Sequence, residues 1–159
     1  MRILIAAIGK LKDDAEREII ARYVKRADAQ GRTLGLGPIE IIELPESRAS
    51  SADARKTDEA QRLLKAAAAT YRIALDVEGK HLTSESFAGL LGKQADVGTK
   101  ICAFLIGGPD GHGADVLKAA NLKLSLGAIT LPHGLARVVL IEQLYRATTI
   151  LSGHPYHRG

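Results

Sequence analysis

The stretch Ile101-Cys102-Ala103-Phe104-Leu105-Ile106 runs directly into Gly107-Gly108-Pro109-Asp110-Gly111-His112-Gly113. Six apolar residues in a row predict a strand that is buried on both faces, as in a parallel sheet. The glycine-rich segment predicts a turn at the carboxyl end of that strand, where open α/β sheets bind their ligands. The turn has neither the Gly-Lys-Ser/Thr of a P-loop nor a G-x-G-x-x-G pattern. Its spacing alone therefore leaves a ligand loop and a plain turn equally open.

Apolar and amphipathic runs alternate along the whole chain on both sides of this stretch. Strands are predicted at 3–8, 39–44, 71–77, 100–106 and 122–126, and helices at 13–29, 55–69, 84–94, 114–120 and 135–151. The polar segment 46–54, with three serines, predicts a mobile loop. This alternation predicts an α/β fold with a mostly parallel sheet flanked by helices, in a single domain spanning residues 1–159.

The composition limits the partners and sites that the chain can have. Its 159 residues include 22 basic and 18 acidic side chains, and the net charge of +4 favours an anionic partner only weakly. Aromatic residues make up 4%, too few for a platform that stacks several single-stranded bases. Cys102 is the only cysteine, which excludes an internal disulfide and a cysteine-based zinc site and fits a reducing cytoplasm. No run reaches the roughly 20 apolar residues of a membrane helix, so we expect no membrane partner.

The segment 126–137 is a loop of small and apolar residues that leads into the last predicted helix. Such a loop suits a flat apolar ligand, for example an adenine. His133 and Arg137 lie one helical turn apart on the same face. The equally weighted alternative is that His133 caps the helix and Arg137 pairs with Glu142 or with a backbone carbonyl.

Two other segments concentrate polar groups. Asp76 and Glu78 follow a predicted strand, where acidic residues serve acid–base chemistry or, more often, solvation and capping. The last six residues, His154-Pro155-Tyr156-His157-Arg158-Gly159, hold two histidines, a tyrosine and an arginine. A proline between the histidines disfavours a helical His-x-x-x-His arrangement, so we expect no metal site.

The predicted helix 135–151 has apolar residues on nearly all of its faces, which is typical of a buried helix. A domain of this size has little room to bury such a helix completely. The pattern therefore predicts that the helix also contacts a second copy of the chain.

Several pieces of the chain occur in an order that resembles one protein family. They are Leu75-Asp76-Val77-Glu78-Gly79-Lys80, Phe104-Leu105-Ile106-Gly107-Gly108-Pro109-Asp110-Gly111, Leu124-Ser125-Leu126, Thr130-Leu131-Pro132-His133 with Arg137, Glu142-Gln143-Leu144-Tyr145-Arg146-Ala147 and His154-Pro155-Tyr156-His157. Together they resemble the ribosomal RNA large subunit methyltransferase H family of the SPOUT class. The resemblance is strong over 71–159, and the first 70 residues agree in length and element order.

The resemblance implies a SPOUT-type α/β knot, a C-terminal trefoil knot that sequence rules would not predict because knots are nearly absent from proteins. It implies a cytoplasmic homodimer that binds S-adenosyl-L-methionine. The implied reaction is methylation of N3 of a pseudouridine in helix 69 of the 23S rRNA, on the assembled 70S ribosome. It implies no DNA partner.

Matched residue by residue, the resemblance places cofactor contacts in the loops singled out above. These are Leu75, Gly107, Leu126, Gly127, Ala128, Ile129, Thr130 and Leu131. The family's polar positions near the methyl group and the RNA match His133, Arg137, His154, Tyr156, His157 and Arg158. Of these we expect Arg137, Tyr156, His133 and His157 to be catalytic.

The N3 atom of a uracil-type ring carries a proton at pH 7, so the reaction needs a group that accepts it or stabilises the resulting anion. His133 is the expected base, with Tyr156 and His157 as rivals. Arg137 or Arg158 would stabilise the enolate-like oxygens or hold a phosphate.

Two other classes of function stay open. A non-catalytic ribosome-binding or assembly factor of the same fold would bind the cofactor without transferring methyl. A nucleotide-binding enzyme would use the turn at Gly107 for phosphate, although the missing Lys-Ser/Thr disfavours it. Contacts with the ribosome would fall to the basic residues Arg48, Arg55, Lys56 and Lys80.

Overall fold

The computed structural model describes residues 1–68 and 71–159. In that part of the chain, five strands form one sheet in the order β2-β1-β4-β3-β5, and every neighbouring pair is parallel. The strands are β1 (Arg2–Ile8), β2 (Ile39–Leu44), β3 (Tyr71–His81), β4 (Ile101–Ile106) and β5 (Leu122–Ser125). The predicted parallel α/β sheet is thus confirmed, and the trefoil knot stays a prediction.

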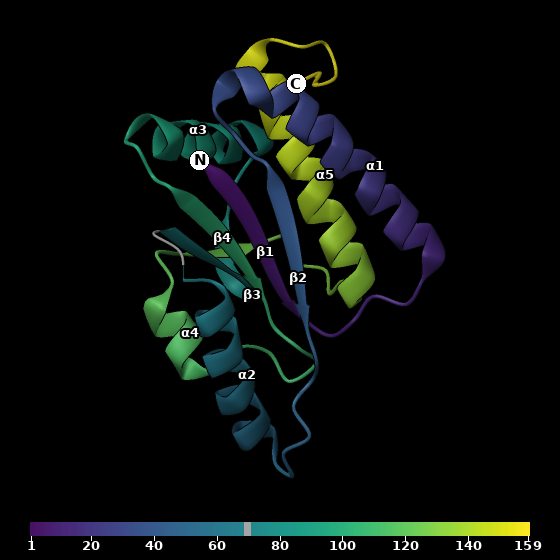
Figure 1. Cartoon of the computed structure of the whole chain (residues 1–159), viewed down its shortest axis with the longest axis vertical. Helices are drawn as coiled ribbons and strands as arrows, with labels where there is room; N and C mark the ends of the chain where they lie inside the picture. The colour runs from purple at the N-terminus through teal and green to yellow at the C-terminus, as the bar shows by residue number, and fades with distance from the viewer. Residues whose placement is uncertain (69–70) are drawn as a thin grey trace.

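Helices cover both faces of the sheet (Figure 1). They are α1 (Asp14–Gly31), α2 (Ala52–Ala66), α3 (Ser84–Asp96), α4 (Ala114–Ala119) and α5 (His133–Ser152), with a short 3-10 helix at Arg32–Leu34. One core packs α1, α3 and α5 against residues such as Ile5 and Phe104. The other core packs α2 and α4 against the alternate residues Ala6 and Leu105. Both faces are buried, which explains why the strands read as continuous apolar runs.

Side-chain caps set the starts of three helices. Asp13, Ser51 and Thr83 each accept a hydrogen bond from the backbone N–H three residues later. Because Ser51 is the cap, α2 begins at Ala52, three residues before the predicted start. The predicted end of this helix, Ala69, lies outside the described residues.

The segment 45–51 is held by α2, and residues 52–54 of the predicted loop 46–54 already belong to that helix. Three side chains of α2 bind its backbone: Arg62 Nη1 donates to the Pro45 carbonyl (2.6 Å), Glu59 Oε1 accepts from the Ser47 N–H (2.9 Å) and Arg55 Nη1 donates to the Ala49 carbonyl (3.2 Å). The sequence showed a polar, serine-rich segment but not the helix that satisfies its backbone.

The helix α5 is buried within its own chain. It lies between α1 and α3 on one face of the sheet (Figure 1), and its core residues include Leu140, Ile141 and Leu144. Two helices and the sheet thus cover most of its apolar residues within one chain, and the predicted contact of this helix with a second copy stays a prediction. Leu135, 46% exposed in the first turn, is the large apolar residue of α5 that stays open to solvent. None of the described helices is long and apolar enough to cross a membrane.

The strand β3 is longer than predicted and contains a bulge. Leu75 and Lys80 both lie opposite Leu124 of β5, so residues 76–79 are pushed out of the ladder. Gly79 permits this close approach, since a Cβ atom there would lie 2.7 Å from backbone carbon atoms of Lys123 and Leu124. The bulge therefore fixes how β3 and β5 meet beside the end of β4.

Replacing Gly79 by alanine should separate β3 from β5, because the added methyl group would meet backbone that cannot rotate away. We expect Gly79→Ala to lower the free energy of unfolding by about 1–3 kcal/mol, as overpacking usually does. Urea denaturation would measure the loss. The matched control is Gly89→Ala on α3, where a Cβ meets no heavy atom within 4 Å and alanine should stabilise the helix by up to about 1 kcal/mol. Equal effects of both substitutions would contradict the proposed role of the bulge.

Candidate functional site

A cavity of about 370 Å³ lies at the carboxyl ends of β4 and β5, beside the bulge of β3, at the edge of a parallel sheet where ligands bind. The bulge of β3, the glycine turn after β4 and the loop after β5 form its walls. Among the predicted cofactor residues, Leu75, Gly107, Leu126, Gly127, Ile129 and Leu131 line this cavity. Ala128 and Thr130 lie in the same loop and are exposed, without lining the cavity. The structure thus brings together three segments that are far apart in the sequence.

The glycine turn is packed too closely for larger residues. A Cβ atom on Gly108 would lie 2.9 Å from Glu59 Oε2, and one on Gly107 would lie 3.1 Å from the Gly111 backbone. The turn is anchored to α2 by Arg55, which binds both carboxylate oxygens of Asp110 (2.7 and 3.2 Å). That guanidinium lowers the pKa of Asp110 below its ordinary value. Because Arg55 is committed to this ion pair, it is a poor candidate for the phosphate contact predicted for it.

The cavity wall is mostly apolar and carries a few polar groups. Lys56, Asp76 and His112 are among its lining residues. Val77 and Ile129, which also line it, are 71% and 81% exposed. These two side chains add exposed apolar surface at the mouth of the cavity.

His112 is a pocket residue for which the sequence alone predicted no role. Its Nε2 lies 3.0 Å from the Leu105 carbonyl at the end of β4, and its buried Nδ1 has no hydrogen-bond partner among the described residues. Burial lowers the pKa of His112, although the Leu105 and Leu75 carbonyls and the charge of Asp76 act in the opposite direction. The ring is therefore neutral at pH 7, with Nε2–H as the donor. A titratable residue inside a glycine turn was the signal that could have revealed it.

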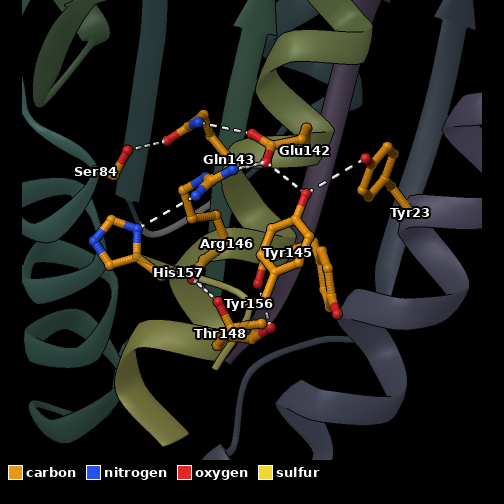
Figure 2. A network of polar contacts seen from close by, with 10 residues as sticks. Tyr23, Ser84, Glu142, Gln143, Tyr145, Arg146, Thr148, Tyr156 and His157 are labelled. Carbon is orange, nitrogen blue, oxygen red and sulfur yellow. Dashed lines mark hydrogen bonds and ion pairs between the residues drawn. The ribbon is translucent and has the colours of Figure 1, made fainter. Parts of the chain in front are cut away.

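The C-terminal tail folds back onto α5. Figure 2 shows Tyr156 and His157 beside Glu142 and Arg146 on the middle turns of that helix. The Tyr156 hydroxyl donates to Glu142 Oε1 (2.9 Å), and the Arg146 guanidinium lies 4.8 Å from the centre of the Tyr156 ring. His157 bridges Arg146 (3.3 Å) and Glu85 of α3 (2.9 Å).

Tyr156 is a hydrogen-bond donor in this arrangement. Burial raises the pKa of Tyr156, and its contacts with Tyr23 (3.4 Å) and Glu142 raise it further. A phenol with a raised pKa keeps its proton at neutral pH. The arrangement therefore suits Tyr156 to orient a substrate or the tail rather than to accept a proton.

Arg137 is buried, with 4% of its side chain exposed. Its guanidinium donates to Glu43 Oε2 (2.6 Å) and to the carbonyls of Ile8 (3.2 Å) and Gly9 (2.6 Å). It pairs with a backbone carbonyl, as the structural alternative predicted, but its carboxylate partner is Glu43 of β2 rather than Glu142. Arg137 lines a separate cavity of about 410 Å³ between α1, β2 and α5, which is mostly apolar.

One chain does not bring the four predicted catalytic residues together. His133 is exposed at the start of α5, next to the loop 126–131, whereas Arg137 points toward β1 and β2. Tyr156 and His157 contact the helix at Glu142 and beyond, about 14 Å along the axis from His133 at 1.5 Å per residue. The tail itself lies at the opposite end of the molecule from the arrowheads of the strands (Figure 1).

Comparison with known proteins identifies the family. The family described as "Predicted SPOUT methyltransferase" matches residues 1–157. The chain belongs to the SPOUT methyltransferase family. It is 49% identical to "Ribosomal RNA large subunit methyltransferase H" of Xanthobacter autotrophicus, over 100% of both chains. The protein of the same name from Rhizobium leguminosarum is 47% identical over 99% of both chains. The family resemblance read from the sequence is therefore confirmed.

Two solved structures share the fold of this chain. A probable methylase family protein from Haemophilus influenzae superposes with a TM-score of 0.53 at 13% identity, over 99% of this chain and 70% of the other. A putative methylase family protein from Neisseria gonorrhoeae superposes with a TM-score of 0.50 at 13% identity, over 98% and 94%. At this identity the two structures support the fold alone.

Removing the Arg137 guanidinium should destabilise this SPOUT fold, because Glu43 would lose its charge partner and two carbonyls would lose a side-chain donor. We expect Arg137→Met to cost about 3 kcal/mol of unfolding free energy at pH 7, at the low end for a buried ion pair since Glu43 is partly exposed. Burial acts to raise the pKa of Glu43, but the Leu11 N–H and Arg137 outweigh it and lower the pKa. The stabilisation is thus present above the ordinary pKa of 4.5 and is lost as the pH falls through the lower, folded-state value. Urea denaturation at several pH values should show the difference between variant and wild type shrinking below about pH 4.5. A constant difference would contradict the pairing.

Acid should destabilise the pocket through His112. The folded state holds this ring neutral, so below its ordinary pKa of 6.5 the unfolded chain binds a proton that the folded chain does not. Between pH 7.5 and 5.5 we expect wild type to lose up to about 1 kcal/mol more unfolding free energy than His112→Leu. The matched control is His81→Leu, at an exposed histidine, which should follow the wild-type slope. Identical slopes for wild type and His112→Leu would mean that the ring is not held neutral.

Proposed function

We propose that this chain is an S-adenosyl-L-methionine-dependent methyltransferase that acts on N3 of a pseudouridine in helix 69 of the 23S rRNA, within the 70S ribosome. The observation that carries the proposal is the cavity at the ends of β3, β4 and β5, which gathers six of the eight residues expected to hold the cofactor. The names of relatives at 47–49% identity, "Ribosomal RNA large subunit methyltransferase H", support rRNA as the substrate.

The residues of the cavity fit such a cofactor. Backbone at Gly107 and the apolar loop 126–131 can enclose a flat adenine, and the glycines allow the close approach that a Cβ atom would prevent. Asp76 offers a carboxylate to the positive charges of the sulfonium and ammonium groups, and Lys56 offers a cation to the carboxylate. When bound, the cofactor supplies an electrophilic methyl group on sulfur.

The chain's own residues would align the target nucleobase and accept its N3 proton. Alignment of reacting groups is worth roughly 7–11 kcal/mol, and acid–base help about 10²–10⁴-fold in rate. His133 is our candidate for the base, because it is exposed and adjoins the cofactor loop. Tyr156 and His157 would position the target nucleobase and the C-terminal tail. Arg158, which is exposed near the chain end, would contact phosphate. Arg137 would act indirectly, by fixing the first turns of α5 against β1 and β2.

The separation of these residues in one chain supports a homodimer as the active form. If the tail of one copy reached the cavity of the other, Tyr156 and His157 could approach the methyl group while keeping their places on α5. The exposed apolar residues Val77, Ile129 and Leu135 would then meet a partner instead of water. A single SPOUT domain per copy, acting in the cytoplasm, completes the proposal.

The test is methyl transfer to ribosomes. The purified protein would be incubated with radiolabelled S-adenosyl-L-methionine and 70S ribosomes that lack the modification, and the label would be mapped by mass spectrometry. We expect label on a helix 69 pseudouridine and none on an isolated hairpin RNA, since a small domain with few aromatics has little surface to recognise a hairpin alone. Cofactor binding without transfer would instead favour the non-catalytic ribosome factor.

The same assay tests whether His133 is the general base. We expect His133→Ala to reduce the single-turnover rate by about 10²–10⁴-fold while cofactor affinity, measured by calorimetry, stays near wild type. Tyr156→Phe keeps the ring and loses only the hydroxyl, so it separates orientation from proton transfer. A near wild-type rate for His133→Ala would rule out this histidine as the base.

A further inference from the structure

A second, smaller cavity adjoins the cofactor pocket. It encloses about 250 Å³ between α3, α5 and the end of β5, and the residues 124–127 line both cavities. Its walls include the apolar side chains Phe87, Val139 and Leu140. Pockets for drug-sized ligands are roughly 300–1,000 Å³, so this volume suits a single flat ring rather than a whole cofactor.

Gln143 is the residue of α5 that contributes a polar side chain to the lining of this cavity. Figure 2 shows its side chain held between Ser84 of α3 and Glu142. The Ser84 hydroxyl donates to Gln143 Oε1 (2.7 Å), and Gln143 Nε2 donates to Glu142 Oε2 (2.7 Å). Because an ionised carboxylate only accepts hydrogen bonds, Glu142 sets which end of the amide is the nitrogen.

The fixed amide keeps one N–H and one oxygen lone pair beyond these two bonds, since an amide has two donors and two lone pairs. A donor beside an acceptor complements a ring edge in which an N–H adjoins a carbonyl. Pyrimidine bases that have left their stack are read by such hydrogen bonds, with apolar groups against their faces. This cavity offers both: the amide of Gln143 for the hydrogen bonds, and Phe87, Val139 and Leu140 as the apolar groups.

Both uridine and pseudouridine have such an edge at N3, but pseudouridine has a second one, at N1, that uridine lacks. In uridine the N1 atom is bonded to the sugar, whereas in pseudouridine the sugar is attached through carbon and N1 carries a hydrogen. If the amide of Gln143 pairs with N1–H and the adjacent carbonyl, N3 lies on the far side of that carbonyl. N3 is then left free of this contact and can face the neighbouring cofactor pocket.

Resting on the function proposed above, we propose that this smaller cavity receives the target base and that Gln143 selects pseudouridine over uridine. Glu142 and Ser84 are positioning residues, which act by holding the amide. Tyr156 and Arg146 contribute through Glu142, to which the Tyr156 hydroxyl (2.9 Å) and the Arg146 guanidinium (2.7 Å) both donate. The tail network is thereby connected to recognition of the base.

The experiment compares methyl transfer to two substrates. One set of 70S ribosomes carries pseudouridine at the target position, and the other, from cells without the pseudouridine synthase, carries uridine there. Single-turnover rates on both give a selectivity ratio, which a merely structural role of Gln143 would leave unchanged. We expect Gln143→Leu to slow transfer to pseudouridine by at least about tenfold, with little change for uridine, so that the ratio collapses. Ser84→Ala should lower the ratio partly, because it frees one end of the amide.

The matched control is Gln61→Leu, at an exposed glutamine of α2, which should keep the wild-type ratio. Cofactor affinity, measured by calorimetry, should be the same in all four proteins. An unchanged ratio in Gln143→Leu would overturn the inference, as would a loss of its cofactor binding, which would place Gln143 in support of the first pocket. If wild type transfers methyl to neither ribosome, the proposed function fails and this inference falls with it.

Discussion

The parallel direction of the strands is the constraint on which the rest of this structure depends. Since β3, β4 and β5 are neighbours and parallel, their carboxyl ends meet at one edge of the sheet. Three loops that are distant in the sequence therefore share one cavity. The bulge at 76–79, which Gly79 permits, pushes one wall outward beside the glycine turn. A flat and regular β3 would leave this edge with less depth for a ligand.

The helix α5 organises the polar chemistry around that edge. Its first turns are fixed by the buried guanidinium of Arg137, which joins α5 to β1 and β2 through Glu43, Ile8 and Gly9. Its middle turns carry Glu142, the carboxylate shared by Arg146, Gln143 and Tyr156. A rigid helix of 20 residues keeps these two groups apart. An active site built from both needs a second chain or a substrate that bridges them.

Hydrogen bonding explains why the tail is ordered. Chain ends are usually poorly ordered unless something holds them, and here Tyr156 and His157 bind α5 and α3 through Glu142, Arg146 and Glu85. Burial raises the pKa of Tyr156, and the hydrogen bond to Glu142 raises it further, so its hydroxyl stays a donor. A residue predicted to remove a proton is thus better suited to hold a substrate in place.

The sequence by itself determined the parallel α/β sheet, the element order, the family and six residues of the cavity beside the glycine turn, because these follow from local periodicity and from ordered motifs. Tertiary structure alone decided the partners of the charged residues. Arg137 pairs with Glu43, 94 positions away, and Arg55 with Asp110, 55 positions away, and neither pairing has a local signal. The tertiary structure also revealed the pocket residue His112 and the amide of Gln143, which two hydrogen bonds hold in place. Hydrophobic pattern sets which face of an element is buried, whereas pairing of polar side chains depends on how elements pack in three dimensions.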